Sequence, residues 1–106
     1  MFGRQVTMRL KANSASELTR IADTEILPIM RKQKGFRDET TLIAPERSEA
    51  IVSSFWESKE DAEAYDLAAY PEVLKILESV IGEAPTVKNF EIARSTFRKA
   101  LPGRIA

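Results

Sequence analysis

Hydrophobic and polar residues alternate along residues 2–12, which predicts a β-strand with one face toward a core and one toward solvent. The apolar side of this pattern carries Phe2, Val6, Met8 and Leu10. Residues 36–44 and 49–57 predict two further strands, because they are rich in β-branched and aromatic residues. The turn-forming residues 45–48 lie between them, so we expect an antiparallel hairpin. Residues 86–93 predict a fourth strand.

A helix is predicted after the first strand, where hydrophobic residues recur every three to four positions. Ser14 and Glu17 have the spacing of a capping box, in which each side chain binds the backbone of the other residue. Pro28 is expected to kink or split this helix, because proline has no backbone N–H to donate. Gly35 suits the left-handed position just past the last turn.

A second helical region follows the strand that ends in Trp56, the single tryptophan of the chain. Ser58 is predicted to cap its first helix, with acidic residues in the first turn where the helix dipole favours negative charge. That helix is expected to end near Tyr70. Pro71 is well placed to begin another helix, and Gly82 to close it.

The resulting order is strand, helix, two strands, helix pair and strand, within a single domain over residues 1–106. With right-handed crossovers this order predicts an α+β, ferredoxin-like β-α-β-β-α-β fold with four antiparallel strands and helices on one face. Alternation along the third strand places Ile51, Ser53 and Phe55 on one side and Ala50, Val52, Ser54 and Trp56 on the other. Neither side is polar enough for water, so we expect a homodimer in which a second copy covers the helix-free face.

The composition narrows the possible partners. Sixteen basic residues balance sixteen acidic ones, so no overall positive charge favours nucleic acid or an anionic membrane. The basic tail from Ser95 has no stacking aromatic residue beyond Phe97, which also disfavours nucleic acid binding. No apolar run has the length of a membrane span, and the N-terminus lacks the pattern of a signal peptide. We therefore expect a cytoplasmic protein without a membrane segment.

The chain contains no cysteine and no histidine. The first absence excludes disulfides, thiolate nucleophiles and zinc–thiolate sites. The second removes the usual base at neutral pH and the commonest metal ligand. Acid–base chemistry would therefore rely on Asp, Glu, Lys or Tyr with a shifted pKa, and we expect neither a metal nor a cofactor.

Two short motifs resemble the antibiotic-biosynthesis-monooxygenase-like family. They are Gly35-Phe36 after the first helix, and Phe55-Trp56-Glu57-Ser58-Lys59-Glu60 before an alanine-rich helix. The resemblance extends over residues 2–94 and implies a homodimeric α/β barrel. The family includes cofactor-free oxygenases of polyphenols and quinols, haem-degrading enzymes, proteins that handle aldehydes or quinones, and members without known activity.

The haem-degrading branch of that family is not matched. It uses an asparagine on the first strand, a tryptophan nine residues after the strand-end tryptophan, and a histidine ten residues further on. The corresponding positions here are Val6, Tyr65 and Lys75, so only the aromatic position is partly matched. Haem degradation is therefore not expected.

Five residues are candidates for binding a substrate: Trp56, Tyr65, Tyr70, Met8 and Phe36. Trp56 would either lie over an aromatic ligand or pack in the core, and the large surface that tryptophan buries favours packing. The hydroxyls of Tyr65 and Tyr70 would either donate to a substrate oxygen or simply reach solvent.

Charged residues of the sheet and of one helix have simpler explanations than a site. Arg9, Arg37, Glu39 and Glu91 would bind a charged ligand or form ion pairs, and ion pairs are the preferred interpretation. Glu57, Glu60, Asp61 and Glu63 form an acidic cluster at a helix start, where acidic residues are expected for capping alone. A metal site there is not expected.

Two functional hypotheses remain. The first is an oxidoreductase, a cofactor-independent monooxygenase-like protein that acts on a small aromatic or quinol substrate. In such chemistry the substrate supplies electrons to oxygen, and the protein supplies an apolar pocket, an orienting donor and a modest base. The alternative is a non-catalytic dimeric module that binds a small hydrophobic ligand or serves in assembly. The sequence itself identifies no catalytic residue.

Overall fold

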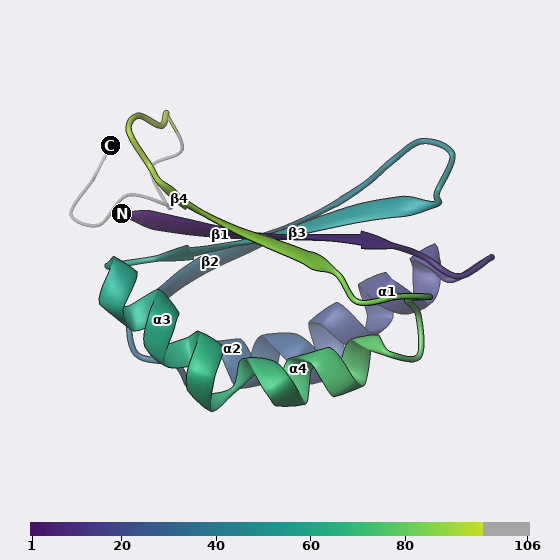
Figure 1. Cartoon of the computed structure of the whole chain (residues 1–106), viewed down its shortest axis with the longest axis horizontal. Helices are drawn as coiled ribbons and strands as arrows, with labels where there is room; N and C mark the ends of the chain where they lie inside the picture. The colour runs from purple at the N-terminus through teal and green to yellow at the C-terminus, as the bar shows by residue number, and fades with distance from the viewer. Residues whose placement is uncertain (97–106) are drawn as a thin grey trace.

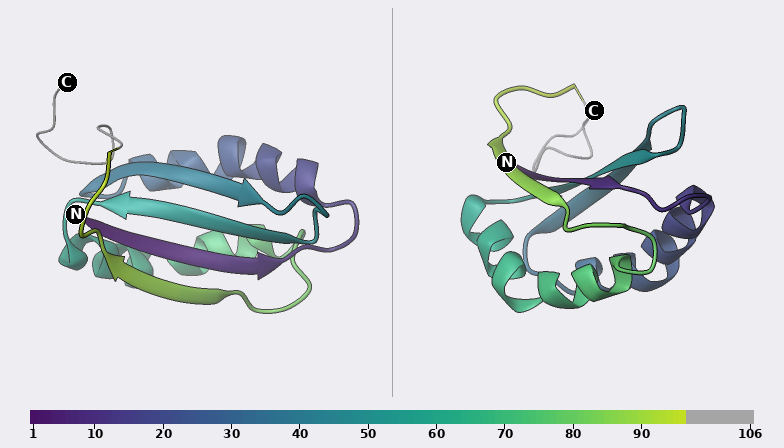
Figure 2. Two further views of the ribbon diagram at one scale, coloured as in Figure 1. Left: turned by 90° about the horizontal axis from the view of Figure 1, so that it is seen from above. Right: turned by 45° about the vertical axis from the view of Figure 1, so that its right-hand side comes forward.

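The computed structural model of the chain describes residues 1–96. The elements in chain order are β1 (Phe2–Arg9), α1 (Ala15–Ile21), the π-helical η1 (Ala22–Ile26), α2 (Leu27–Arg31), β2 (Phe36–Ile43), β3 (Glu49–Trp56), α3 (Lys59–Ala68), α4 (Tyr70–Leu77) and β4 (Thr86–Glu91). The strands form one antiparallel sheet in the order β2-β3-β1-β4, and the helices all lie against one face of it (Figures 1 and 2). This is the predicted ferredoxin-like fold. The basic tail from Phe97 onward lies outside the described residues.

The strand register confirms the predicted division of the sheet into two faces. Val6 lies opposite Val52, and Arg4 lies opposite Ser54, on the face that the helices cover. The core between sheet and helices contains Met8, Leu18, Ile21, Trp56, Tyr65, Leu77 and Val80, all nearly inaccessible to solvent. Burial of this apolar surface is the main term that holds the helices on the sheet.

The start of α1 differs from the prediction. The Ser14 side chain makes no capping hydrogen bond, and its backbone (φ −103°, ψ 0°) is not in the extended conformation typical of a capping residue. The Glu17 carboxylate instead accepts two hydrogen bonds from Arg20, at 2.8 and 2.6 Å. The predicted capping box is therefore wrong, because Glu17 pairs with Arg20 along the helix.

The first helical region stays continuous at Pro28, but it changes helix type just before this residue. α1 passes into the π-helical η1, and α2 begins at Leu27 with Pro28 in its first turn. Proline is tolerated there because the first turn of a helix has no internal partner for its N–H groups. The wider turn of η1 was not predicted, and such turns are frequent at functional sites.

Gly35 has the predicted left-handed conformation, with φ of 81°. A Cβ atom at this position would lie only 2.1 Å from Oδ2 of Asp61 in α3. A side chain is therefore disfavoured both by the backbone conformation and by the close approach of α3.

The predicted cap of α3 is confirmed, since Ser58 Oγ accepts a hydrogen bond of 3.1 Å from the Asp61 amide. α4 ends at Leu77, earlier than predicted, and β1 and β4 are also shorter than predicted. For β1 and α4, the segments that follow them pair with each other instead. Leu10 bridges to Ile81, and the Lys11 amide donates to the Val80 carbonyl at 2.8 Å, so these backbone groups cannot continue the helix.

The helix-free face of the sheet carries exposed apolar side chains. Leu42 lies beside Ile51, and both Phe55 and Phe90 flank Gly3. Leu42 and Phe90 are 54% and 47% exposed, which is high for residues of this size. The predicted homodimer remains a prediction. No helix within residues 1–96 is both long and apolar enough to cross a membrane.

Candidate functional site

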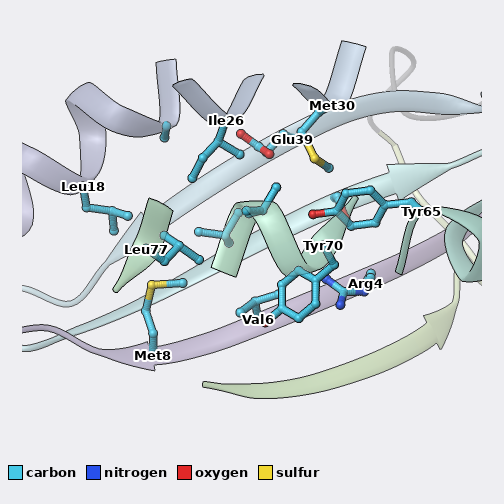
Figure 3. A pocket seen from close by; sticks show the side chains of 14 residues that line it. Arg4, Val6, Met8, Leu18, Ile26, Met30, Glu39, Tyr65, Tyr70 and Leu77 are labelled. Atoms are coloured by element: carbon cyan, nitrogen blue, oxygen red, sulfur yellow. The ribbon is translucent and has the colours of Figure 1, made fainter. Parts of the chain in front are cut away.

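A narrow cavity lies between the sheet and the helices (Figure 3). Its volume of about 20 Å³ is enough for about one water molecule. The apolar part of its wall includes Val6, Met8, Leu18, Ile26, Met30 and Leu77, from β1, α1, η1, α2 and α4. The polar side chains of the wall are those of Arg4, Glu39, Ser54, Tyr65 and Tyr70. A few polar groups in an apolar cavity are typical of a small-molecule site.

Arg4 is a buried cation at one end of this cavity. Its side chain is 2% exposed and donates to Oδ1 of Asp66 in α3 at 2.5 Å. The guanidinium carbon lies 4.1 Å from the centre of the Tyr70 ring and 5.3 Å from that of Tyr65. The faces of aromatic rings attract cations, so the two tyrosines partly replace the water that Arg4 has lost.

Tyr65 is buried in α3, and its hydroxyl points into the cavity (Figure 3). Its ring stacks on Trp56, with centroids 5.0 Å apart and the planes at 28°. Burial raises the pKa of Tyr65, against an opposing attraction from Arg4. Burial also raises the pKa of Tyr70, and Arg4 again opposes the shift. Both phenols therefore stay protonated at neutral pH and are available as hydrogen-bond donors.

Glu39 reaches the cavity from β2, where it lies opposite Ser54 (Figure 3). Its Oε2 atom is buried and has no hydrogen-bond partner among the described residues. Burial raises the pKa of Glu39 to about 7, with further contributions from the charges of Asp23 and Asp38. A carboxyl group with this pKa both holds and releases a proton near neutral pH, which is the property required of a general base.

The structure brings together three of the five predicted binding residues. Met8, Tyr65 and Tyr70 all line the cavity. Phe36 instead lines a separate groove of about 300 Å³ between β2 and the first helical region.

Trp56 lies behind Tyr65, away from the cavity wall. It is fully buried, and its Nε1 donates to Ser54 Oγ at 2.9 Å. Its ring and that of Phe36 pack in a T-shaped arrangement, with centroids 5.6 Å apart. These contacts support the packing interpretation of Trp56.

Arg4 and Glu39 are the charged cavity residues, and the sequence did not single them out as a site. Arg4 occupies the apolar register of the first strand, between Phe2 and Val6, and this position was a usable signal. Glu39 was expected to form an ion pair. Of the four sheet residues with that expectation, only Arg37 has one among the described residues, with Glu57 at 2.6 Å. A β-bulge between Phe36 and Asp38 turns Glu39 to the helix-covered face, and strict alternation does not predict a bulge.

The described residues offer no group of three or more His, Cys, Asp or Glu side chains that could hold a metal ion. Lys75, at the position of the iron-binding histidine in the haem-degrading branch, is exposed on α4. The chemistry available at the cavity is therefore that of a carboxyl group, two phenols and a guanidinium.

No protein-family model matches the sequence, and no curated protein is significantly similar to it. The fold, however, is similar to several solved structures. A monooxygenase from the gene ActVA-Orf6 of Streptomyces coelicolor, in complex with nanaomycin D, gives a TM-score of 0.76 at 17% identity over 89% of this chain and 88% of that one. The NE2512 protein of Nitrosomonas europaea, of unknown function, gives a TM-score of 0.72 at 14% identity over 89% of this chain and 90% of that one.

A protein of Bordetella bronchiseptica proposed to be an antibiotic biosynthesis monooxygenase gives a TM-score of 0.71 at 12% identity, over 88% of this chain and 97% of that one. At these identities the comparison concerns the fold alone. The chain has the fold of the antibiotic-biosynthesis-monooxygenase-like proteins, as the motifs around Gly35 and Trp56 predicted.

Proposed function

We propose that this chain is a cofactor-independent monooxygenase that oxidises a small phenol or quinol in the cavity between its helices and its sheet. The observation that carries the proposal is Glu39, a buried carboxyl group without a hydrogen-bond partner in the described structure, at the wall of an otherwise largely apolar cavity. A buried polar group without a partner destabilises a protein by roughly 1–3 kcal/mol, so its presence calls for a functional reason.

In this proposal Glu39 accepts the proton of the substrate hydroxyl, and the Tyr65 hydroxyl donates a hydrogen bond to the resulting phenolate. Glu39 and Tyr65 both line the same cavity, so one substrate hydroxyl there would lie within reach of both. The phenolate then gives electrons to dioxygen. One oxygen atom becomes the second carbonyl of a quinone and the other leaves as water, so the ring loses four electrons and dioxygen gains them.

The present cavity has room for about one water molecule and is too small for any phenol or quinol, so substrate binding requires side chains to move apart. Met8 and Met30 both line the cavity, and their side chains are unbranched. Methionine changes rotamer readily and fills irregular spaces, which makes these two residues the natural sites of adjustment. We therefore expect substrate binding to displace methionine side chains before it displaces the sheet.

Oxygen uptake with 1-naphthol tests the proposal. The expected result is one dioxygen consumed and one 1,4-naphthoquinone formed per naphthol. Glu39→Gln should lower kcat/KM by roughly 10²–10⁴, the usual contribution of general base catalysis. Glu49→Gln, at an exposed position on β3, is the matched control and should retain activity. Binding of naphthols and quinols without oxygen uptake would contradict the proposal and support the non-catalytic ligand-binding module.

We also propose that the working form is a homodimer in which a second copy covers the helix-free face. The exposed Leu42 and Phe90 on that face support this proposal. Burying them against an identical surface would remove their apolar area from water, as isologous dimer interfaces do.

A further inference from the structure

Arg4 borders two separate spaces in the molecule. One is the inner cavity, and the other is a groove of about 350 Å³ that lies beside α3. Besides Arg4, the groove is lined by Phe2, Ala62, Glu63, Asp66, Leu67 and Asn89. The buried guanidinium therefore lies where a molecule in the groove meets the cavity that contains Glu39 and Tyr65.

The ion pair between Arg4 and Asp66 is unequal in its exposure to solvent. The Arg4 side chain is 2% exposed, whereas the Asp66 side chain is 49% exposed. The Asp66 carboxylate would itself be well solvated if an arriving anion displaced it, because half of its side chain is already exposed. Arg4 has no such alternative, and an unpaired buried charge is strongly unfavourable. An anion that arrives from the groove would find a desolvated cation whose partner is easily replaced.

The rest of the groove suits an aromatic ring. Phe2, Ala62 and Leu67 give it apolar walls, and Leu67 is 82% exposed although leucine is usually buried. The volume of about 350 Å³ lies within the range of roughly 300–1,000 Å³ found for small-molecule pockets. The rings of Tyr65 and Tyr70, which already flank the guanidinium, add aromatic surface at the inner end.

We infer that the groove binds an aromatic carboxylate, whose anionic group displaces Asp66 and pairs with Arg4. The inference rests on the proposed function and narrows its substrate class: the substrate is a phenol or quinol that carries a carboxylate. The carboxylate is held at Arg4. One part of the ring system lies against the apolar walls of the groove, and the part that carries the hydroxyl extends past Arg4 into the enlarged cavity toward Tyr65 and Glu39. Arg4 thus serves as a specificity-determining residue, while Asp66 is an internal competitor that occupies the site in the free protein.

Isothermal titration calorimetry with 2-naphthoate and 2-naphthamide isolates the effect of the ligand's negative charge on its affinity. The two probes have nearly the same shape, and neither carries a phenol for Glu39 to deprotonate. Titrations at about pH 6 keep Glu39 largely protonated, because its pKa is about 7, and so avoid repulsion between two anions. The parent protein should bind 2-naphthoate more tightly than 2-naphthamide.

Two variants and one control test the assignment of that preference to Arg4. Arg4→Met should abolish this preference for 2-naphthoate. In the parent protein the preference should be roughly tenfold or more in affinity, because the ligand's carboxylate gains a hydrogen bond to a charged group. Asp66→Asn should increase the affinity for 2-naphthoate severalfold, because the ligand no longer competes with a carboxylate. Glu60→Gln removes one negative charge from an exposed position of the same helix and should change neither affinity by a comparable factor.

Equal affinities of the parent protein for both probes would overturn the inference, as would an Asp66→Asn effect no larger than that of Glu60→Gln. Asp66→Asn remains informative if Arg4→Met fails to fold, because it alters only the exposed partner. The result is also separable from the proposed function. Tighter binding of 2-naphthoate than of 2-naphthamide, without oxygen uptake on phenols, would support the carboxylate site and refute the monooxygenase. Turnover of neutral naphthols by a protein that binds both probes equally would support the monooxygenase and refute the carboxylate site.

Discussion

Replacing Glu39 by glutamine should change how the stability of the protein depends on pH. Burial raises the pKa of Glu39 to about 7 from an ordinary value of 4.5. Between these values the folded protein holds a proton on Glu39 that the unfolded chain has lost, so the free energy of unfolding falls as pH rises through this window. At about 1.4 kcal/mol per pKa unit the full shift corresponds to about 3.5 kcal/mol, and the side chain's partial exposure makes about 2 kcal/mol a better expectation.

Glutamine has nearly the shape of protonated glutamic acid and cannot ionise. At about pH 5 the variant and the parent should therefore have similar stability. At about pH 8.5 the variant should be more stable than the parent by about 2 kcal/mol, because the parent must hold a buried carboxylate. Urea denaturation followed by the fluorescence of Trp56, which is fully buried in the folded protein, measures both free energies.

Glu49→Gln controls for the loss of a negative charge elsewhere on the sheet, and it should leave the pH dependence of the parent in place. The reasoning is refuted if the parent is equally stable at pH 5 and 8.5. It is also refuted if the gain of Glu39→Gln over the parent is the same at both pH values, since that gain would then not come from ionisation.

Three further predictions concern packing and assembly. Trp56→Ala should lower the free energy of unfolding by roughly 3–5 kcal/mol, and Trp56→Phe should lower it by much less. Circular dichroism melts measure both, and an alanine variant as stable as the parent would contradict the packing role. Gly35→Ala should destabilise the protein by roughly 1–3 kcal/mol in the same melts, because φ at this position is 81° and Asp61 must move. Gly82→Ala is the control and should be nearly neutral, because no atom lies within 4 Å of the new Cβ. Light scattering at micromolar concentration should show a dimer for the parent and a monomer for Phe90→Asp; a monomeric parent would refute the dimer.

Hydrophobic periodicity predicted the fold well, because it acts through many residues at once. The strand faces, the cap at Ser58, the change of helix type before Pro28 and the left-handed Gly35 each follow from local rules that tertiary structure left unchanged. The ends of the elements were predicted less well. α4 stops at Leu77 because the backbone beyond it pairs with residues near Leu10, and that pairing depends on the folded chain.

The candidate site was predicted only in part. Tyr65 and Tyr70 were accessible to sequence reasoning, because they lie on the helix expected to cover a pocket. Glu39 was not, because a single bulged residue in β2 decides which face it occupies. Its shifted pKa then arises from burial and from Asp23 and Asp38, whose positions come from two different elements.

The pH dependence of oxygen uptake with 1-naphthol tests the central claim most directly, because it reports the ionisation of the proposed base during turnover. We predict that kcat/KM of the parent rises with pH and levels off above an apparent pKa near 7, the value for Glu39. In Glu39→Gln the remaining rate should be low and should lack this rise. A parent without turnover, or a Glu39→Gln variant with the same rate and pH profile as the parent, would contradict the assignment of Glu39 as the base.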